Sequence, residues 1–171
     1  MMGKKYKLTD EAIQHYGKTL YRIEALIDFG DVDKGDKGGF VESEENLSHD
    51  GNCWVCDNAK VYGNAVVRGD AKVYGNAKVG GDAKVTNNRD YIVFKNWWSS
   101  GRYFTWTRSN NKWSVGCFYG TGEELIAKAY KDSELSGREY ERIVRYVEAI
   151  NKPIKRLNRI QKIVCKLFKI K

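Results

Sequence analysis

The chain has 171 residues, of which 42% are hydrophobic, and its 30 Lys and Arg against 22 Asp and Glu give a formal net charge of +8. No apolar run approaches the ~18 residues of a membrane helix, and Met1 to Lys5 are not followed by the apolar segment of a secretory signal. These features argue against a membrane-spanning or secreted chain, and we expect a cytoplasmic protein with one domain, or one domain and an appendage.

The positive charge is concentrated at the C-terminal end. Residues 152–171 carry eight Lys or Arg and no acid, which leaves 22 basic and 22 acidic residues in the first 151. A nucleic-acid-binding role would therefore depend on the last twenty residues rather than on the body of the protein.

Residues 1–40 are predicted to form an N-terminal β-hairpin cap and a loop. Val, Ile, Leu and Tyr alternate with polar residues here, which favours strands at residues 6–8, 13–16 and 20–29 with a turn at Gly17-Lys18. The following GDVDKGDKGG stretch, residues 30–39, lacks the D-x-D-x-D-G spacing and the closing Glu of a calcium loop. We expect a plain loop there.

Six consecutive hexads occupy residues 51–86: GNCWVC, DNAKVY, GNAVVR, GDAKVY, GNAKVG and GDAKVT. Each has a valine at one phase and a small residue two places earlier. The valines are Val55, Val61, Val67, Val73, Val79 and Val85, and the small residues are Cys53, Ala59, Ala65, Ala71, Ala77 and Ala83. Because side chains alternate between the two faces of a strand, both phases point inward, and stacked repeats bury them.

A period of six with Gly, Asn or Asp at each junction fits a short strand followed by a tight bend. Three such sides close a triangular coil of about eighteen residues. The aliphatic phase continues backwards through Leu47 and Val41 if two residues are inserted around His49 and Asp50. We therefore predict a mainly β fold with a parallel β-helix of about 2.7 coils at residues 41–88.

These repeats resemble the hexapeptide-repeat, left-handed β-helix family, whose motif places an aliphatic residue four positions before a small one, as in Val61 and Ala65. The resemblance covers residues 41–86. KYKLTDEAIQ and GGFVESEENLS before the repeat, and GRYFTWTRSNNKWSVGCFYGTGEELI behind it, resemble small hexapeptide-repeat proteins of tailed phages and prophages. That group has no established activity, so the resemblance implies an origin, and hence the host cytoplasm, without a mechanism.

Residues 89–120 are strongly aromatic and are predicted to form an antiparallel sheet that caps the coil. Strands are expected at residues 91–96, 103–108 and 113–119, with a hairpin turn at Asn110-Asn111. Inward rings would pack against the coil and the following helices. The outward residues form a candidate partner-binding surface, since Trp, Tyr and Arg dominate interface hot spots; they are Trp97, Trp98, Arg102 and Tyr103.

Residues 121–152 are predicted to form a helical pair, and residues 153–171 a basic amphipathic helix after Pro153. Two capping boxes, Thr121 to Glu124 and Ser136 to Glu139, mark the expected helix starts. The basic helix adds further candidate partner-binding residues: Lys155, Arg156, Arg159, Lys162 and Lys166. Its partner is another protein or a nucleic acid; an anionic membrane is disfavoured because no Trp anchors this helix.

Enzyme chemistry finds little support among the residues. Four cysteines make no disulfide framework, and Cys53 and Cys56 occupy different faces of the repeat, so packing is preferred to a zinc or redox role. The best-known activity of the resembled family is acyl transfer from coenzyme A with a His base. His49, oriented by Asp50 or Glu45, is the candidate for such a base, and His15 lies outside the coil. We expect no catalytic residue, cofactor or metal.

The functional prediction is therefore a non-enzymatic phage or prophage protein that binds a host protein or nucleoprotein complex through its aromatic sheet and basic C-terminal helix. An inhibitor of a host defence nucleoprotein complex is its most specific form. A coenzyme A-dependent acyltransferase and a structural oligomeric scaffold are the alternatives. We also expect a homo-oligomer, either the trimer that the family resemblance suggests or a dimer.

Overall fold

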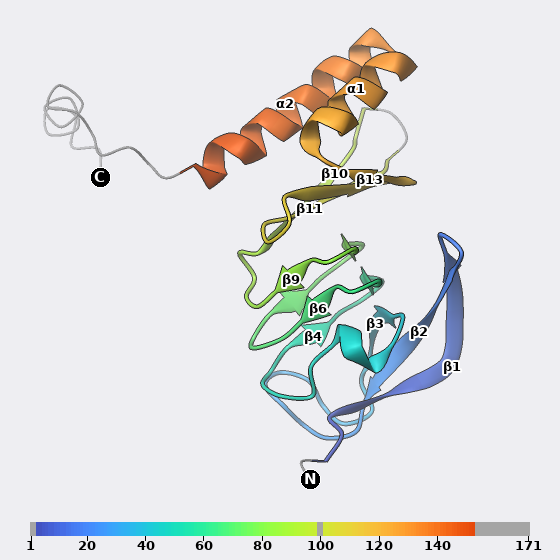
Figure 1. Cartoon of the computed structure of the whole chain (residues 1–171). Coiled ribbons are helices and arrows are strands. Elements are labelled where there is room, and N and C mark those ends of the chain that lie inside the picture. Colours follow the sequence, from blue (N-terminus) through green and yellow to red (C-terminus); the bar gives the residue numbers. More distant parts are fainter. Residues whose placement is uncertain (1–2, 99–100, 153–171) are drawn as a thin grey trace, which may run out of the picture. The chain divides into compact units, whose positions relative to one another are not determined.

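A computed structural model describes residues 3–98 and 101–152 (Figure 1). The described chain is mainly β, with several sheets and two α-helices. It divides into two compact units, Met1–Leu125 and Ile126–Lys171. The predicted basic helix at residues 153–171 lies outside the described residues. No helix among the described residues is long and apolar enough to cross a membrane.

The N-terminal hairpin consists of β1 (Tyr6–His15) and β2 (Lys18–Ala25), paired antiparallel with His15 opposite Lys18. Its two-residue turn is formed by Tyr16 and Gly17, with φ angles of 51° and 75°. Positive φ at both central residues matches the twist of a tight hairpin. The turn therefore begins one residue earlier than the predicted Gly17-Lys18.

The predicted loop at residues 30–39 is wrong at its end, where β3 (Lys37–Val41) already pairs with β2. The reason is the close approach of this strand to the coil. A Cβ added at Gly38 would lie 2.5 Å from the carbonyl oxygen of Val55 and 2.6 Å from the side chain of Ile23. Glycine at this position is thus a packing requirement rather than a turn signal.

The hexads form short parallel strands. They are β4 (Trp54–Val55), β5 (Lys60–Val61), β6 (Val66–Val67), β7 (Lys72–Val73), β8 (Lys78–Val79) and β9 (Lys84–Val85). Val55 lies beside Val73, Val61 beside Val79, and Val67 beside Val85. Partners are eighteen residues apart, so the chain visits three parallel ladders in turn and returns to each after three hexads.

The coil begins where the repeat was traced backwards. Val41 pairs with Val61 and Leu47 with Val67, each across twenty residues rather than eighteen. The two-residue insertion is therefore present. A short 3-10 helix, η1 (Glu44–Asn46), lies within this first coil. The six valines of the inward phase, together with Val41 and Leu47, have no measurable exposure to solvent, so the predicted inward phase is confirmed.

A four-stranded antiparallel sheet follows, in the order β10 (Tyr91–Lys95), β11 (Tyr103–Thr107), β12 (Lys112–Val115) and β13 (Phe118–Gly120). The single strand predicted at residues 113–119 is wrong, because the chain reverses at Gly116-Cys117 and Val115 pairs with Phe118. Gly116 has a φ of 55°, which a strand interior does not allow.

Side-chain oxygens from this region cap the open edge of the last coil. The backbone N–H of Lys72 donates to Asn88 Oδ1, that of Lys78 to Thr105 Oγ1, and that of Lys84 to Ser109 Oγ, at 2.8, 3.0 and 2.7 Å. Exposed strand edges recruit other strands unless such donors are satisfied. The sequence predicts that aromatic rings cap the coil. At this edge, polar side chains also contribute to the cap.

The two helices are α1 (Gly122–Asp132) and α2 (Glu134–Asn151). The capping box before α1 is confirmed: Thr121 N–H donates to Glu124 Oε2 at 2.7 Å, and Glu124 N–H donates to Thr121 Oγ1 at 3.3 Å. The carboxyl of Glu124 consequently has a lowered pKa, because the backbone and hydroxyl of Thr121 hydrogen-bond to its charged form.

The start predicted for the second helix, Ser136, is wrong. Ser133 is the N-cap, and its side chain accepts a hydrogen bond from the Ser136 N–H at 3.1 Å. Gly137 instead lies inside α2, where an added Cβ would come within 2.3 Å of the Tyr130 ring. The S-G-R-E pattern therefore reflects close packing of the ring on the helix rather than a helix start.

Candidate functional site

The aromatic residues predicted to bind a partner lie in and after the connection between β10 and β11. Trp97 is 87% exposed, and its ring meets the half-buried ring of Trp98 edge-on at 6.3 Å. Trp98 in turn lies 6.3 Å from the buried Phe104. Tyr103 is half-buried, with Lys95 Nζ 5.9 Å from its ring centroid. Of the predicted rings, Trp97 is the one that is largely free to meet a partner.

Arg102 is exposed and lies alongside Gly116, since a Cβ added there would be 3.2 Å from Arg102 Cδ. Burial lowers the pKa of Lys78, and the positive charge of Arg102 lowers it further. The same charge opposes the rise that burial causes in the pKa of Tyr16. The structure thus brings Arg102 close to residues of β8 and of the hairpin turn, which sequence reasoning did not connect. The five predicted residues of the basic helix lie outside the described residues.

A row of cations crosses the outer face of the sheet formed by β2, β3, β5 and β8. Arg22 lies opposite Phe40, Phe40 opposite Lys60, and Lys60 opposite Lys78. In β3, β5 and β8 the next residue is an inward valine, so the residues of the row face outward. We call Arg22, Phe40, Lys60 and Lys78 the cationic row.

One end of the cationic row is held by local contacts. Arg22 Nε pairs with Glu11 Oε1 at 2.6 Å, and its guanidinium carbon lies 4.2 Å from the Phe40 ring centroid. Lys60 Nζ lies 5.8 Å from the same centroid and donates to the carbonyl of Asn58 at 3.0 Å. Phe40 therefore has a cation on both sides, and each contact is stabilised by the negative face of its ring.

At the other end, Lys78 Nζ donates to Tyr16 Oη and to the carbonyl of Gly116, both at 3.2 Å. Burial lowers the pKa of both Lys60 and Lys78. The charge of Lys78 lowers the pKa of Lys60 further. Neither ammonium has a carboxylate partner within salt-bridge distance in the part of the chain that the structure describes.

His15 lies beside these lysines, at the end of β1. It is 8% exposed, and its ring packs 4.1 Å from Tyr16 and edge-on to Tyr62 at 5.0 Å. Burial, and then the charges of Lys78 and Lys60, lower its pKa to about 4. Its Nε2 is buried without a hydrogen-bond partner among the described residues. His15 is therefore a neutral imidazole with an unused polar atom at neutral pH.

His49, the predicted candidate base, is engaged differently. Its Nδ1 accepts a hydrogen bond from the Lys5 N–H at 3.2 Å, and its ring stacks on Tyr6 at 4.3 Å. A neutral imidazole that accepts at Nδ1 carries its proton on Nε2. The carboxylate beside Nε2 is Glu44, at 3.8 Å, rather than the expected Asp50 or Glu45. His49 thus connects the N-terminal segment to the start of the coil through its contacts with Lys5 and Tyr6.

Lys5 is a buried residue that sequence reasoning missed. It is 2% exposed, and its Nζ donates to the carbonyls of Gly51 and Cys53 at 3.1 and 2.9 Å and to Cys53 Sγ at 3.4 Å. Lys5 precedes β1, and the sequence around it gave no sign of this burial. Cys53 is buried inside the coil and Cys56 is half-buried. Among the described residues, no three His, Cys, Asp or Glu side chains gather as a metal site.

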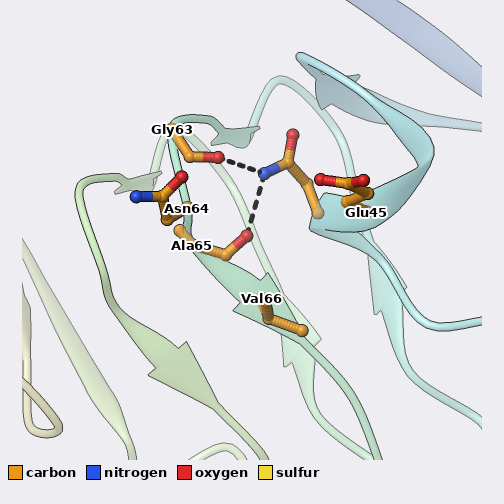
Figure 2. A pocket seen from close by; sticks show the side chains of 6 residues that line it. Glu45, Gly63, Asn64, Ala65 and Val66 are labelled. Carbon is orange, nitrogen blue, oxygen red and sulfur yellow. Dashed lines mark hydrogen bonds between the residues drawn. The ribbon is translucent and has the colours of Figure 1, made fainter.

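Figure 2 shows a small pocket between η1 and the bend before β6. Its volume is about 130 Å³, and it is lined by Glu45, Asn46 and residues 63–66. Asn46 Nδ2 donates to the carbonyls of Gly63 and Ala65 at 2.9 and 2.8 Å. Small-molecule pockets usually measure several hundred Å³. Among the residues that line this pocket, only Glu45 has an ionisable side chain, and the pocket is too small for a substrate of ordinary size.

Comparison with known proteins adds a partial similarity. No protein-family model matches the chain. The chain is 38% identical over 69 residues to a protein of Escherichia coli (strain K12) named uncharacterized acetyltransferase YdcK. The match covers 35% of this chain and 21% of that relative, so the chain spans about a fifth of the relative's length.

Proposed function

We propose that this protein is a non-enzymatic binding protein that contacts a partner macromolecule through Trp97, Trp98, Arg102 and Tyr103. The observation that carries this function is the 87% exposure of Trp97 together with the exposed Arg102, whose carbonyl accepts the N–H of Asn96, the residue before Trp97, at 2.7 Å. A large ring held in water costs free energy that a partner's pocket would recover, and Trp and Arg are the residues most enriched at interface hot spots.

The partner we propose is an acidic surface of a host protein or nucleoprotein complex. The charge of the chain supports this, since Lys95 Nζ lies 5.9 Å from the centroid of the half-buried Tyr103 ring, Arg102 is exposed, and residues 152–171 carry eight further cations. The resemblance of the flanking segments to small phage and prophage proteins supports a host component as the target. Inhibition of a host defence nucleoprotein complex is the most specific form of this function.

A pull-down of the full chain from host lysate tests this function. Trp97→Ala should weaken capture of the partner by roughly 30-fold or more, the loss that truncating a hot-spot residue causes. Tyr74→Ala removes a ring of the coil that is 46% exposed and is the matched control, which should retain the partner. Equal capture by both variants would show that the aromatic surface is not the binding surface.

The basic segment, residues 153–171, separates a protein partner from a nucleic acid. A nucleic-acid contact releases counterions, so binding falls steeply with salt. If residues 153–171 bind nucleic acid, their deletion abolishes a salt-sensitive gel shift. If they bind the protein partner, the deletion weakens the pull-down and the intact chain gives no gel shift.

We further infer that the coil is a left-handed parallel β-helix of the hexapeptide-repeat kind and that the protein forms a trimer or a dimer. The valine and alanine phases and the eighteen-residue spacing of ladder partners support this coil. An experimentally determined structure with a right-handed path between β4 and β5 would contradict the handedness. Light scattering that gives a monomer's mass would contradict the oligomer.

A coenzyme A-dependent acyltransferase is the second candidate, favoured by the partial similarity to a protein named as an acetyltransferase. Both imidazoles have a buried Nε2 without a hydrogen-bond partner among the described residues. His49 accepts from Lys5 at Nδ1 and has the Glu44 carboxylate 3.8 Å from its Nε2. The candidate base is therefore His15, which has no such polar contact at either nitrogen within the described residues. An acyltransferase predicts that acetyl-coenzyme A raises the melting temperature and that His15→Gln abolishes acetyl transfer. Neither effect is expected of a pure binding protein.

A further inference from the structure

Lys60 and Lys78 form a like-charged pair that the fold does not neutralise. They are direct partners in the parallel register of β5 and β8, which places their backbones about 4.8 Å apart. Both are half-buried, and burial lowers the pKa of each. Like charges directly opposite one another destabilise a sheet, so this pair costs free energy in the unliganded protein.

The lysines at the same hexad position in the other two ladders have different surroundings. Lys72 forms an ion pair with Asp31, and Lys84 is exposed. Lys60 and Lys78 are half-buried and have backbone, phenol and ring partners but no carboxylate partner within the described residues. The hexad repeat by itself therefore does not explain why Lys60 and Lys78 are half-buried on the outer face of β5 and β8 without such a partner.

Neighbouring acids are already engaged. Glu11 pairs with Arg22, and Glu42 pairs with Lys18 at 2.6 Å while also accepting the Gly63 N–H. The lowered pKa of each carboxyl follows first from these lysine and arginine contacts. Neither acid is left to compensate the two lysines.

Donors surround the pair instead. The unpartnered Nε2 of His15 is buried close enough for both ammonium charges to act on the ring. Tyr16 Oη lies 3.2 Å from Lys78 Nζ, and the Arg102 charge also acts on Lys78. A buried polar atom without a partner costs free energy, and a bound hydrogen-bonding ligand would remove this cost.

We propose that this face of β5 and β8 binds the phosphate group of a small molecule between Lys60 and Lys78, beside His15. A phosphate carries close to two negative charges at neutral pH, which match the two ammonium groups, and its oxygens accept hydrogen bonds from lysine and imidazole donors. This phosphate site shares Arg102 with the proposed partner surface but does not involve Trp97, and it does not depend on the partner proposed there.

Calorimetric titration of the full chain with inorganic phosphate, at fixed ionic strength and pH 7, tests the site. We expect saturable binding with one phosphate per chain. Lys60→Gln with Lys78→Gln should weaken it by about tenfold or more, because both charges at contact distance are removed. Lys84→Gln, the same hexad position in another ladder, is the matched control and should change the affinity less than about twofold.

The double variant should fold, since it removes a repulsion, and its melting temperature without phosphate should equal or exceed that of the parent. Absence of saturation below about 50 mM phosphate, or unchanged affinity in the folded double variant, would overturn the site. Trp97→Ala should bind phosphate normally, so that a failure of the partner surface and a failure of this site remain distinguishable.

His15 supplies an independent readout, because a bound dianion favours the protonated imidazole. The charged and titratable groups that face it are Lys60, Lys78, Tyr16 and Tyr62. Followed by NMR, the pKa of His15 should rise from about 4 on saturation with phosphate. An unchanged pKa under saturating phosphate would place the ion elsewhere and overturn the site.

The ligand source is distinguished by three probes. Adenosine monophosphate binding more tightly than inorganic phosphate would identify a phosphate ester as the natural ligand, and equal affinity would identify the free ion. Acetate tests the charge requirement: a single carboxylate should bind at least about tenfold more weakly than phosphate. Acetate binding as tightly as phosphate would contradict a phosphate site.

Discussion

At the scale of single residues, three buried or half-buried charged and titratable side chains connect distant parts of the chain. Lys5, His15 and His49 come from the hairpin and the first coil, and each contacts residues distant in sequence. Sequence patterns predict which face of a strand a residue occupies, but not whether a second element covers that face. The burial of Lys5 and His15 was therefore not predictable from their neighbours in the chain.

His15 should make the protein less stable in mild acid. Its folded pKa of about 4 lies below the ordinary value of 6.5, so between these values the unfolded chain binds a proton that the folded chain does not. Stability is complete above pH 6.5 and falls as the pH drops towards 4, with a loss of roughly 2 kcal/mol between pH 7 and 4.5. Urea unfolding at both pH values measures it, and His15→Gln should show a smaller loss.

The His15→Gln variant is needed because carboxyls with lowered pKa, such as Glu11 and Glu42, also lose their contribution to stability as the pH falls through their lowered pKa. They remain in the variant. Identical pH dependence in parent and variant would show that His15 is not buried neutral.

Lys5→Met should destabilise the protein by about 1–3 kcal/mol. The substitution keeps much of the aliphatic stem but removes the donor that satisfies the carbonyls of Gly51 and Cys53. Lys4→Met is the matched control, since the Lys4 side chain is 60% exposed and its pair with Glu44 contributes little. Chemical denaturation compares the two, and equal effects would contradict the buried role of Lys5.

At the scale of elements, the helix starts show how a pattern and its context compete. The capping box at Thr121 is predicted correctly because its two reciprocal hydrogen bonds join residues only three apart in the sequence. The S-G-R-E pattern at Ser136 is the same kind of signal, yet α2 begins at Ser133. The hydrogen bond from the Ser136 N–H to the Ser133 side chain caps the helix at Ser133. Gly137 therefore lies inside α2, where it packs against the Tyr130 ring.

Ser133→Ala should therefore cost about 1 kcal/mol, because the Ser136 N–H loses its acceptor at the first turn of α2. Ser136→Ala removes a hydroxyl inside the helix and should cost less than about 0.5 kcal/mol, since alanine has the higher helix propensity. Thermal unfolding followed by circular dichroism measures both changes. The reverse order would restore the predicted start at Ser136.

At the scale of the whole molecule, the eighteen-residue repeat determines which elements meet within residues 1–125. The hairpin extends along the coil through β3, and the antiparallel sheet caps the edge of the last coil (Figure 1). Both are attached to the ladder formed by β5 and β8. A change in the number of hexads that is not a multiple of three would therefore place these two attachments on different ladders.

Deleting residues 57–74 removes one complete coil and should leave a chain that still unfolds cooperatively. Val79 would then take the place of Val61 beside Val41, so the hairpin and the sheet keep the same ladder. Deleting residues 63–74 removes fewer residues but moves β8 to another ladder, away from Tyr16 and His15. We expect this variant to be less stable than the longer deletion by at least about 2 kcal/mol; calorimetric melting compares them, and the opposite order would contradict the coil.

The sequence by itself determined the coil. Successive side chains of a strand point to opposite faces, and each hexad forms one side of the coil with its valine at the same position. Val55, Val61 and their equivalents had to share an interior wherever the rest of the chain lay. Only the tertiary structure decided what the outward residues meet. Lys60, Lys72, Lys78 and Lys84 occupy the same phase, yet the hairpin turn and the sheet place His15, Tyr16 and Arg102 around one ladder alone. Contacts between residues so distant in the chain depend on how whole elements pack, which a local pattern does not encode.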